Sequence, residues 1–303
     1  MAVLALVMMS GCFFDSDDPL PPLEGDIYQY VVSDLKIPTN NNEAREFGLD
    51  LNGDKNKTGD NQLGMVLGLL ENLGLGTAST VREALQRGGL LMLVEVQTTS
   101  LEDSRDAGLT TFLGGDAMPD ACTDETNLAT CGQHLKGTGS FSVDLDTASH
   151  QARGPIVGGA FLGDTGIMPV EFAISLAGVI RLDLRGARVK ITELTPDGAR
   201  GVFAGAIAPI DLEGVVIPEA AEQVDRIVVD ECKGPTSAAN PCGCSGRGKT
   251  LWEVFDKNHD CRVDVGEVAS NDIVRSLFAP DVRVHGQDML SFGVGVELAR
   301  ATF

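Results

Sequence analysis

The chain has 303 residues, 43% of them hydrophobic, which is enough for one large domain or two ordinary ones with a sizeable core. Its formal net charge of −21 excludes nucleic acid as a partner, because phosphate backbones bind basic surfaces. The same charge argues against attraction to anionic lipid headgroups.

The N-terminal residues predict the compartment. Residues 2–9, AVLALVMM, are an apolar run too short to span a bilayer, and Ser10 and Gly11 lead from it into Cys12. This pattern resembles the lipobox of bacterial lipoproteins, in which the cysteine is lipidated and becomes the mature N-terminus. The resemblance implies a signal peptide over 1–11, and a lipid anchor with an acidic, Pro-rich tether over 12–23. Phe13 after the cysteine favours, by analogy, the outer membrane.

This segment departs from the lipoprotein pattern in two ways. It has no Lys or Arg before the apolar run, and Met9 stands at the third position before the cysteine. A start codon further upstream would account for the missing basic residues. The alternative is a plain apolar N-terminus that is buried in the fold.

An acidic loop follows the first predicted strand, Ile27–Ile37. Four of its oxygen-bearing side chains recur at every second residue, and a fifth lies six residues beyond the third: Asp50, Asn52, Asp54, Asn56 and Asp60. The spacing resembles the calcium loops of EF-hand, dockerin and thrombospondin type-3 proteins, and implies a Ca²⁺ site. Its twelfth position is Asn61 rather than Glu. The alternative is a polar turn in which Asp60 or Asn61 caps the next helix.

Apolar spacing next predicts two helices, 62–73 and Ser79–Gln86, and then strands Leu90–Gln97 and Leu109–Leu113. From Gly139 to Pro209 the pattern has period two, with turn residues at Gly163-Asp164, Arg185-Gly186 and Pro196-Asp197-Gly198. The strands predicted there are Ser140–Leu145, Ile156–Leu162, Val170–Leu176, Val179–Leu184, Arg188–Leu194 and Val202–Ile207. Such closely spaced strands indicate an antiparallel β-sandwich or a barrel-like sheet.

The C-terminal third alternates between helical and strand patterns. A helix is predicted over Pro218–Val229, and Leu290–Leu298 alternates as a half-buried last strand. Between them lie a Cys-rich segment, 231–249, and a predicted helix-loop-helix, 250–279. The sequence therefore predicts one α+β domain over 24–303, with the helix-loop-helix inserted before the last strand.

Residues 256–267, DKNHDCRVDVGE, have the ligand spacing of a twelve-residue calcium loop. Positions 1, 3, 5, 7, 9 and 12 are Asp256, Asn258, Asp260, Arg262, Asp264 and Glu267. Side-chain oxygens at 1, 3 and 5, a backbone carbonyl at 7 and a bidentate Glu at 12 converge on one Ca²⁺ in such loops. With their apolar flanks, residues 251–278 resemble an EF-hand of the calmodulin type. The resemblance implies Ca²⁺ binding and names no reaction.

The loop departs from the EF-hand pattern at position 6, where Cys261 replaces the glycine that takes a positive φ. A residue other than glycine in that conformation costs on the order of 1 kcal/mol. Either the Ca²⁺ affinity is lowered, or a disulfide from Cys261 holds the turn. A third alternative is an EF-like loop that is closed by its own hydrogen bonds without an ion.

Without Cys12, six cysteines remain: Cys122, Cys131, Cys232, Cys242, Cys244 and Cys261. An even number in an exported chain predicts three disulfides, of which Cys122–Cys131 is the simplest to assign. The other four cysteines allow three pairings. The alternative is a metal site built from Cys242-x-Cys244 with Cys232, Cys261 or His259.

The sequence contains no common catalytic motif: no G-x-S-x-G, no H-E-x-x-H and no phosphate-binding glycine loop followed by Lys-Ser/Thr. We therefore expect a non-enzymatic, calcium-binding lipoprotein on the surface of a bacterial cell, with a β-rich domain stabilised by Ca²⁺ and disulfides. The alternatives are an extracellular binding or adhesion module for a glycan or protein, and a secreted hydrolase with a dispersed site. A Ca²⁺ sensor is disfavoured, because nearby disulfides resist opening.

Overall fold

The structure is a computed structural model that describes residues 22–54, 59–72, 77–175 and 178–303. The predicted signal peptide and Cys12 lie outside the described residues, as do most of the tether and Asn56.

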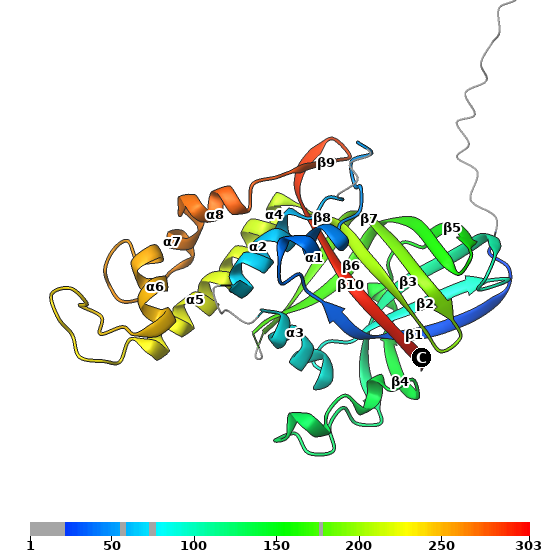
Figure 1. The fold of residues 1–303 in the computed structure, drawn as a ribbon, viewed down its shortest axis with the longest axis horizontal. Coiled ribbons are helices and arrows are strands. Elements are labelled where there is room, and N and C mark those ends of the chain that lie inside the picture. Colours follow the sequence, from blue (N-terminus) through cyan, green and yellow to red (C-terminus); the bar gives the residue numbers. More distant parts are fainter. Residues whose placement is uncertain (1–21, 55–58, 73–76, 176–177) are drawn as a thin grey trace, which may run out of the picture.

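The protein is an α+β fold built on a large, mostly antiparallel sheet, as the sequence predicts (Figure 1). The strands are β1 (Asp26–Lys36), β2 (Met92–Thr98), β3 (Ser104–Met118), β4 (Gly139–Asp144), β5 (Ala152–Val157), β6 (Ala160–Ser175), β7 (Gly178–Thr195), β8 (Gly198–Ile207), β9 (Val282–Val284) and β10 (Gln287–Thr302).

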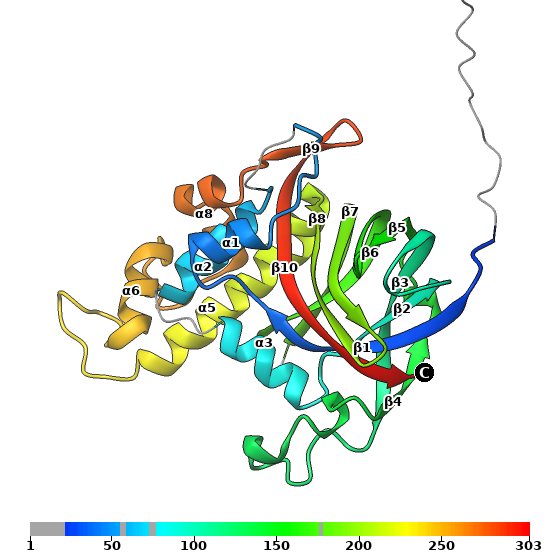
Figure 2. The ribbon, with the colours of Figure 1, turned by 45° about the vertical axis from the view of Figure 1, so that its right-hand side comes forward.

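The antiparallel pairings form a closed ring. β1 pairs with β2 on one side and with β10 on the other, and β3 pairs with both β2 and β5. Strands β5, β6, β7, β8 and β10 then follow one another in order. Of the two predicted arrangements, the pairings match a barrel-like sheet rather than two facing sheets (Figure 2). β4 joins β3 and, in parallel, β10, while β9 pairs with β10.

Several predicted turns are wrong, because long strands bend at bulges instead of ending. Arg185-Gly186 lies inside β7, where the register shifts and Gly186 has a φ of +56°. Gly163-Asp164 likewise lies inside β6, beside another register shift. The turn between β5 and β6 is instead at Gly158-Gly159, within the predicted strand Ile156–Leu162. The turn at Pro196-Asp197 is confirmed.

The last strand differs from its predicted half-buried form. β10 is buried on both faces from Met289 to Val296, because the end of a helix covers the face that carries Gly293 and Gly295. A Cβ at Gly293 would lie 2.1 Å from the carbonyl oxygen of Phe47, and one at Gly295 would lie 2.7 Å from its ring. These two glycines allow the helix end to pack directly on the strand.

Helices flank the sheet in two groups. The first group has three members rather than the two predicted: α1 (Asn41–Glu46), α2 (Gln62–Asn72) and α3 (Thr77–Gln86). The second comprises α4 (Pro209–Asp211), α5 (Ile217–Glu231), α6 (Gly246–Phe255), α7 (Val265–Ala269) and α8 (Asp272–Leu277). Short 3₁₀ turns follow β3 and β4, and a π-helical turn, Leu212–Val216, joins α4 to α5. No helix in the described part of the chain is long and apolar enough to cross a membrane.

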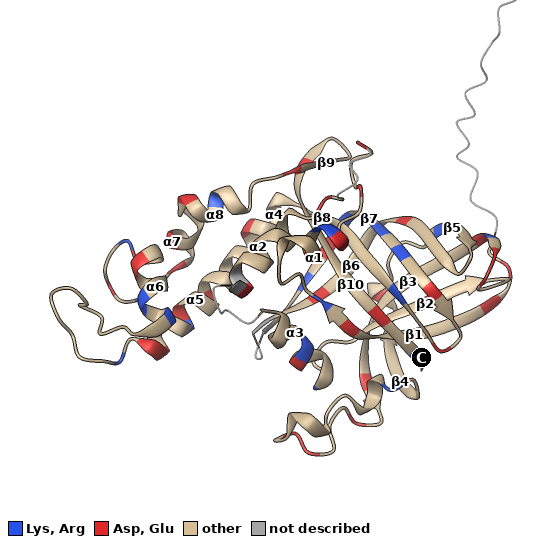
Figure 3. Ribbon diagram, viewed as in Figure 1, with Lys and Arg blue, Asp and Glu red and all other residues tan. Residues whose placement is uncertain are grey.

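Helices α6, α7 and α8, with the C-terminal part of α5, form a lobe at one end of the molecule, whereas α4 and the start of α5 lie beside the sheet (Figures 1 and 2). One hydrophobic core runs from the sheet interior, including Tyr30 and Phe203, to Trp252 and Val263 in this lobe. Acidic and basic residues occur on both the sheet and the lobe (Figure 3). The helical lobe is therefore part of the folded domain, although it lies at its edge.

Candidate metal centre

The predicted calcium loop lies between two helices of the lobe. Helix α6 ends at Phe255, and Asp256 follows as its C-terminal cap. Asp264 is the N-cap of α7: its Oδ1 accepts a hydrogen bond from Glu267 N at 2.8 Å, and Glu267 Oε2 accepts one from Asp264 N at 3.1 Å. This reciprocal capping box fixes the direction in which the chain enters α7.

The helix after the loop is shorter than predicted. The sequence predicts apolar helical spacing from Val268 to Phe278, but the chain breaks at Ser270 and starts again as α8. Asn271 causes the break, because its side-chain oxygen caps α8 by accepting from Ile273 N and Val274 N. Ile273 consequently lies 57% exposed rather than in the core.

Asp256, at position 1 of the loop, is buried, with 4% of its surface exposed. Its Oδ1 accepts from Asp260 N at 3.1 Å, and its Oδ2 accepts from Cys261 N at 2.8 Å. The carboxylate therefore points into the loop and holds its first turn closed.

Glu267, at position 12, is buried at the opposite end of the same loop, with 8% exposed. Its Oε1 accepts from Lys257 N at 2.9 Å and from Asn258 N at 3.2 Å. Lys257 does not pair with it, since its Nζ donates to the carbonyl and hydroxyl oxygens of Ser270. No ion pair links Asp256 or Glu267 to a cationic side chain among the described residues.

Asn258 and Asp260, at positions 3 and 5, lie on the exposed side of the loop. Asn258 Oδ1 accepts from Asp260 N at 2.8 Å, and its Nδ2 donates to Asp260 Oδ2 at 3.1 Å. Asp260 Oδ1 accepts from Arg262 N at 2.9 Å. Every acidic or amide side chain of the predicted ligand set thus accepts a hydrogen bond from at least one backbone N–H of the loop or its flanks. These hydrogen bonds are the ones expected under the alternative of an EF-like loop closed by its own hydrogen bonds.

The turn at position 6 has the backbone form that the sequence predicts. Cys261 has a φ of +66°, in the left-handed region that favours glycine. It is joined to Cys242 by a disulfide. The remaining pairs are Cys122–Cys131, as predicted, and Cys232–Cys244. Three disulfides indicate that the chain folds in an oxidising compartment.

The disulfides oppose the alternative of a thiolate metal site. Among the described residues, one group of His, Cys, Asp or Glu side chains has its ligand atoms within 4.8 Å of one another: Cys242, Asp256 and Cys261. Two of these three share the disulfide, so they provide no thiolate. The carboxylates of Asp256, Asp260, Asp264 and Glu267 do not form such a group. The oxygen donors that remain are those a hard cation such as Ca²⁺ prefers.

The second predicted loop, 50–60, lies beside the sheet and is closed by a bridge between Leu49 and Asp60. Asp50 Oδ1 accepts from Gly53 N at 2.7 Å, and Asn52 Oδ1 accepts from Asp54 N at 2.9 Å. Asp60 is 8% exposed, and its Oδ2 accepts from Leu51 N at 2.8 Å. Asn56 lies outside the described residues, so this ligand set is only partly seen.

Asp60 lies in an unfavourable electrostatic environment. Burial raises the pKa of its carboxyl, and the charges of Asp54, Asp281 and Asp50 raise it further. Asp281 comes from the segment before β9 and was not predicted, because nothing in the local sequence links it to residue 60. The capping alternative also has support at this loop, since Asn61 Oδ1 accepts from Gly64 N at 2.9 Å. Capping by Asn61 does not involve the Asp60 carboxylate, whose Oδ2 accepts from Leu51 N instead.

A separate cavity of about 620 Å³ lies between α3, β3, β6 and the loop closed by Cys122–Cys131. Four carboxylates line it: Asp116, Asp120, Glu125 and Glu171. Burial raises the pKa of Glu171, which Arg181 opposes. Arg87 also lines it, bound to Glu83 at 2.7 Å. The sequence does not predict this concave acidic surface, because its lining residues come from segments that are far apart along the chain.

The chain was compared with known protein families, curated proteins and solved structures. No family matches the chain. No curated protein and no solved structure matches it either.

Proposed function

We propose that the protein is an exported calcium-binding protein in which Ca²⁺ occupies the loop Asp256–Glu267 and stabilises the helical lobe. The observation that carries the proposal is the pair of buried carboxylates at the two ends of this loop. Asp256 and Glu267 are each more than nine-tenths buried, and no cationic side chain in the described residues pairs with them. Buried charges require a counter-charge or dense hydrogen bonding.

The donor set fits Ca²⁺ in chemistry. A carboxylate offers about four acceptor positions, of which Asp256 uses two and Glu267 uses three for backbone N–H groups. The carbonyl of Arg262 accepts no hydrogen bond from any residue that the structure describes. Together with the oxygens of Asn258 and Asp260, these groups provide the all-oxygen ligands of a hard cation at the positions expected of a calcium loop.

The ion would act mainly on stability rather than on catalysis. It would link the end of α6 to the start of α7, and a ligand that binds only the folded state stabilises that state by mass action. An extracellular setting, where Ca²⁺ reaches millimolar levels, would keep even a weak site filled. We extend the proposal to the loop 50–60, where a cation would neutralise Asp60 and its acidic neighbours, and to lipidation of Cys12 as the anchor to the bacterial cell envelope.

Calorimetric titration of the purified, oxidised protein with Ca²⁺ tests the proposal. Glu267→Gln keeps an oxygen for the capping box but removes the bidentate charge, so we expect at least a tenfold weaker affinity at this site. Glu222→Gln on α5 is the control, because it removes one carboxylate that pairs with Arg226 outside the loop. A wild-type protein that takes up no Ca²⁺, or a Glu267→Gln variant that binds as tightly as wild type, would contradict the proposal.

The acidic cavity between α3, β3 and β6 supports a second candidate, a binding module for a small organic cation. Its four carboxylates outnumber the one lining cation, Arg87. Titration with spermidine in the presence of saturating Ca²⁺ separates the two candidates. Heat that disappears in Asp116→Asn but persists in Glu267→Gln would assign the binding to this cavity.

A further inference from the structure

The middle of the calcium loop is held from outside the loop. Its positions 6, 7 and 8 are Cys261, Arg262 and Val263, and each is bonded to a distant part of the chain. Cys261 is tied to Cys242 by the disulfide. The other two residues are held by one side chain, Asp225 of α5.

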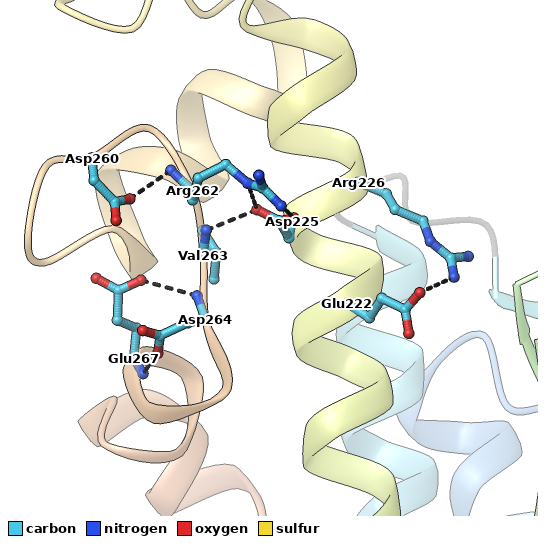
Figure 4. A network of polar contacts seen from close by, with 8 residues as sticks. All are labelled: Glu222, Asp225, Arg226, Asp260, Arg262, Val263, Asp264 and Glu267. Carbon is cyan, nitrogen blue, oxygen red and sulfur yellow. Dashed lines mark hydrogen bonds and ion pairs between the residues drawn. The ribbon is translucent and has the colours of Figure 1, made fainter.

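Asp225 uses both of its oxygens on this part of the loop (Figure 4). Its Oδ1 accepts from Arg262 Nε at 2.8 Å and from Val263 N at 3.0 Å, and its Oδ2 accepts from Arg262 Nη2 at 2.6 Å. The Asp225 side chain is 15% exposed, whereas that of Arg262 is 64% exposed. The Asp225 carboxylate, which lies on α5, is thus the buried partner, and it positions Arg262 and Val263 of the loop.

The bond to Val263 N fixes a complete peptide plane. In a trans peptide the N–H of one residue and the C=O of the residue before it point in opposite directions. Since Val263 N–H points at Asp225, the carbonyl of Arg262 points away from α5. Figure 4 shows Asp260 and Glu267 on that opposite side of the chain. The carbonyl at position 7, the backbone ligand of such a loop, is therefore directed toward the predicted ligands.

We propose that Asp225 is a positioning residue of the calcium site, which directs the Arg262 carbonyl toward the ion by holding the peptide between Arg262 and Val263. The inference rests on the proposed function of the loop. Asp225 also pairs with the Arg262 guanidinium, which would otherwise be an unpaired positive charge on the residue whose carbonyl faces Ca²⁺.

Variants of Asp225 and Arg262 separate positioning from charge and from general stability. Asp225→Ala removes the acceptor for Val263 N–H, and we expect Ca²⁺ affinity to fall roughly tenfold. Asp225→Asn keeps a side-chain oxygen for that N–H, and Arg262→Ala keeps both the carbonyl and the Val263 bond, so each should bind within about threefold of wild type. Glu222→Ala, one turn earlier on α5, is the matched control and should bind like wild type.

The affinities are measured by calorimetry at 25 °C in full-length oxidised protein, beside melting curves of each variant in chelator. If Asp225→Ala lowers the melting temperature in chelator but binds Ca²⁺ as tightly as wild type, Asp225 is merely structural and the inference is overturned. A wild-type protein that binds no Ca²⁺ overturns the proposed function itself, which is a separate result.

Carbon-13 NMR of the Arg262 carbonyl keeps the inference testable if Asp225→Ala does not fold. In the wild-type protein we expect the resonance of this carbonyl to shift on saturation with Ca²⁺. An Arg262 carbonyl that does not shift, in a protein whose Asp256 and Glu267 carboxylate resonances do, would overturn the inference.

Discussion

At the scale of single residues, the two loops differ in how the charge of their buried carboxylates is stabilised. Asp256 and Glu267 bind several backbone N–H groups, whereas Asp60 binds one and faces the charges of three other acids. Hydrogen bonds to a carboxylate stabilise its charged form, and neighbouring negative charges destabilise it. A cation bound at Asp60 would offset the repulsion between this carboxylate and its acidic neighbours.

Asp60→Asn is expected to change stability in opposite directions with and without Ca²⁺. In chelator, the variant should melt at a higher temperature than wild type, because it removes a buried charge beside Asp54 and Asp281 while its amide oxygen still accepts from Leu51 N. On addition of Ca²⁺, the melting temperature of the variant should rise by less than that of wild type. Thermal melts in both conditions check this. A variant that melts at the wild-type temperature in chelator would contradict the electrostatic argument. An equal rise in melting temperature on adding Ca²⁺ to both proteins would show that this loop binds no Ca²⁺.

His134 predicts a pH dependence of stability. Its ring is fully buried, and burial lowers its pKa, an effect that the nearby backbone of Leu85 partly offsets. Below the ordinary histidine pKa of about 6.5, His134 therefore binds a proton more readily in the unfolded protein than in the folded protein. Stability is consequently lost as the pH falls from about 6.5 through the lowered pKa of the folded state. The loss from this group is at most about 1.4 kcal/mol per pH unit.

Urea unfolding of wild type and His134→Phe at pH 7.5 and pH 5.5 measures this loss. Phenylalanine retains the ring, which meets Phe141 edge-on at 6.0 Å, but does not titrate. The variant should lose less free energy of unfolding than wild type between the two pH values. Equal losses would show that His134 does not cause the dependence.

At the scale of elements, the loop Asp256–Glu267 is held by the helices around it and by a disulfide. The loop fits between α6 and α7 through local interactions, namely the cap at Asp256 and the capping box at Asp264 and Glu267. Its middle is fixed by α5 and by Cys242, which lies 19 residues before Cys261. The disulfide joins Cys242 to Cys261, the residue that has a positive φ at position 6, where an EF-hand has glycine.

Two double variants test this role of the disulfide. Cys242→Ser with Cys261→Gly removes the disulfide but supplies a residue that takes a positive φ freely, while Cys242→Ser with Cys261→Ser removes both. We expect the glycine variant to bind Ca²⁺ roughly fivefold more tightly than the serine variant, since the conformation costs a non-glycine residue on the order of 1 kcal/mol. Calorimetry gives both affinities.

The pair Cys122→Ser with Cys131→Ser is the control, because it removes a disulfide elsewhere in the chain. Its affinity should equal that of wild type. Glycine and serine variants of equal affinity would show that the turn at Cys261 does not depend on the disulfide.

Local patterns in the sequence predicted the sheet class and the positive φ at Cys261, because both depend on residues close along the chain. The ligand set of Asp256–Glu267 stays a prediction. Contacts between distant segments were not predictable. Asp225 lies 37 residues before Arg262 on a helix whose spacing explains only its apolar face. Asp281 reaches Asp60 only because β9 and β10 fold back beside the N-terminal loop. The strand boundaries failed at Gly163 and Gly186 because a glycine at a bulge resembles a turn.

At the scale of the whole molecule, a closed sheet carries a helical lobe through one continuous core. The sheet is held by pairings all around its ring, whereas the lobe consists of helices joined by loops and two disulfides. Ca²⁺ in the loop Asp256–Glu267 would therefore stabilise the lobe more than the sheet.

The most direct test of a calcium-stabilised fold is the melting temperature of the oxidised wild-type protein, measured by calorimetry in Ca²⁺ and in chelator. At a Ca²⁺ concentration a hundredfold above the dissociation constant, binding at one site adds about 2.7 kcal/mol of stability, which corresponds to a rise of about 4 °C in a chain of 303 residues. We expect such a rise, and a larger one if both loops bind. Identical melting temperatures in Ca²⁺ and in chelator would contradict the account.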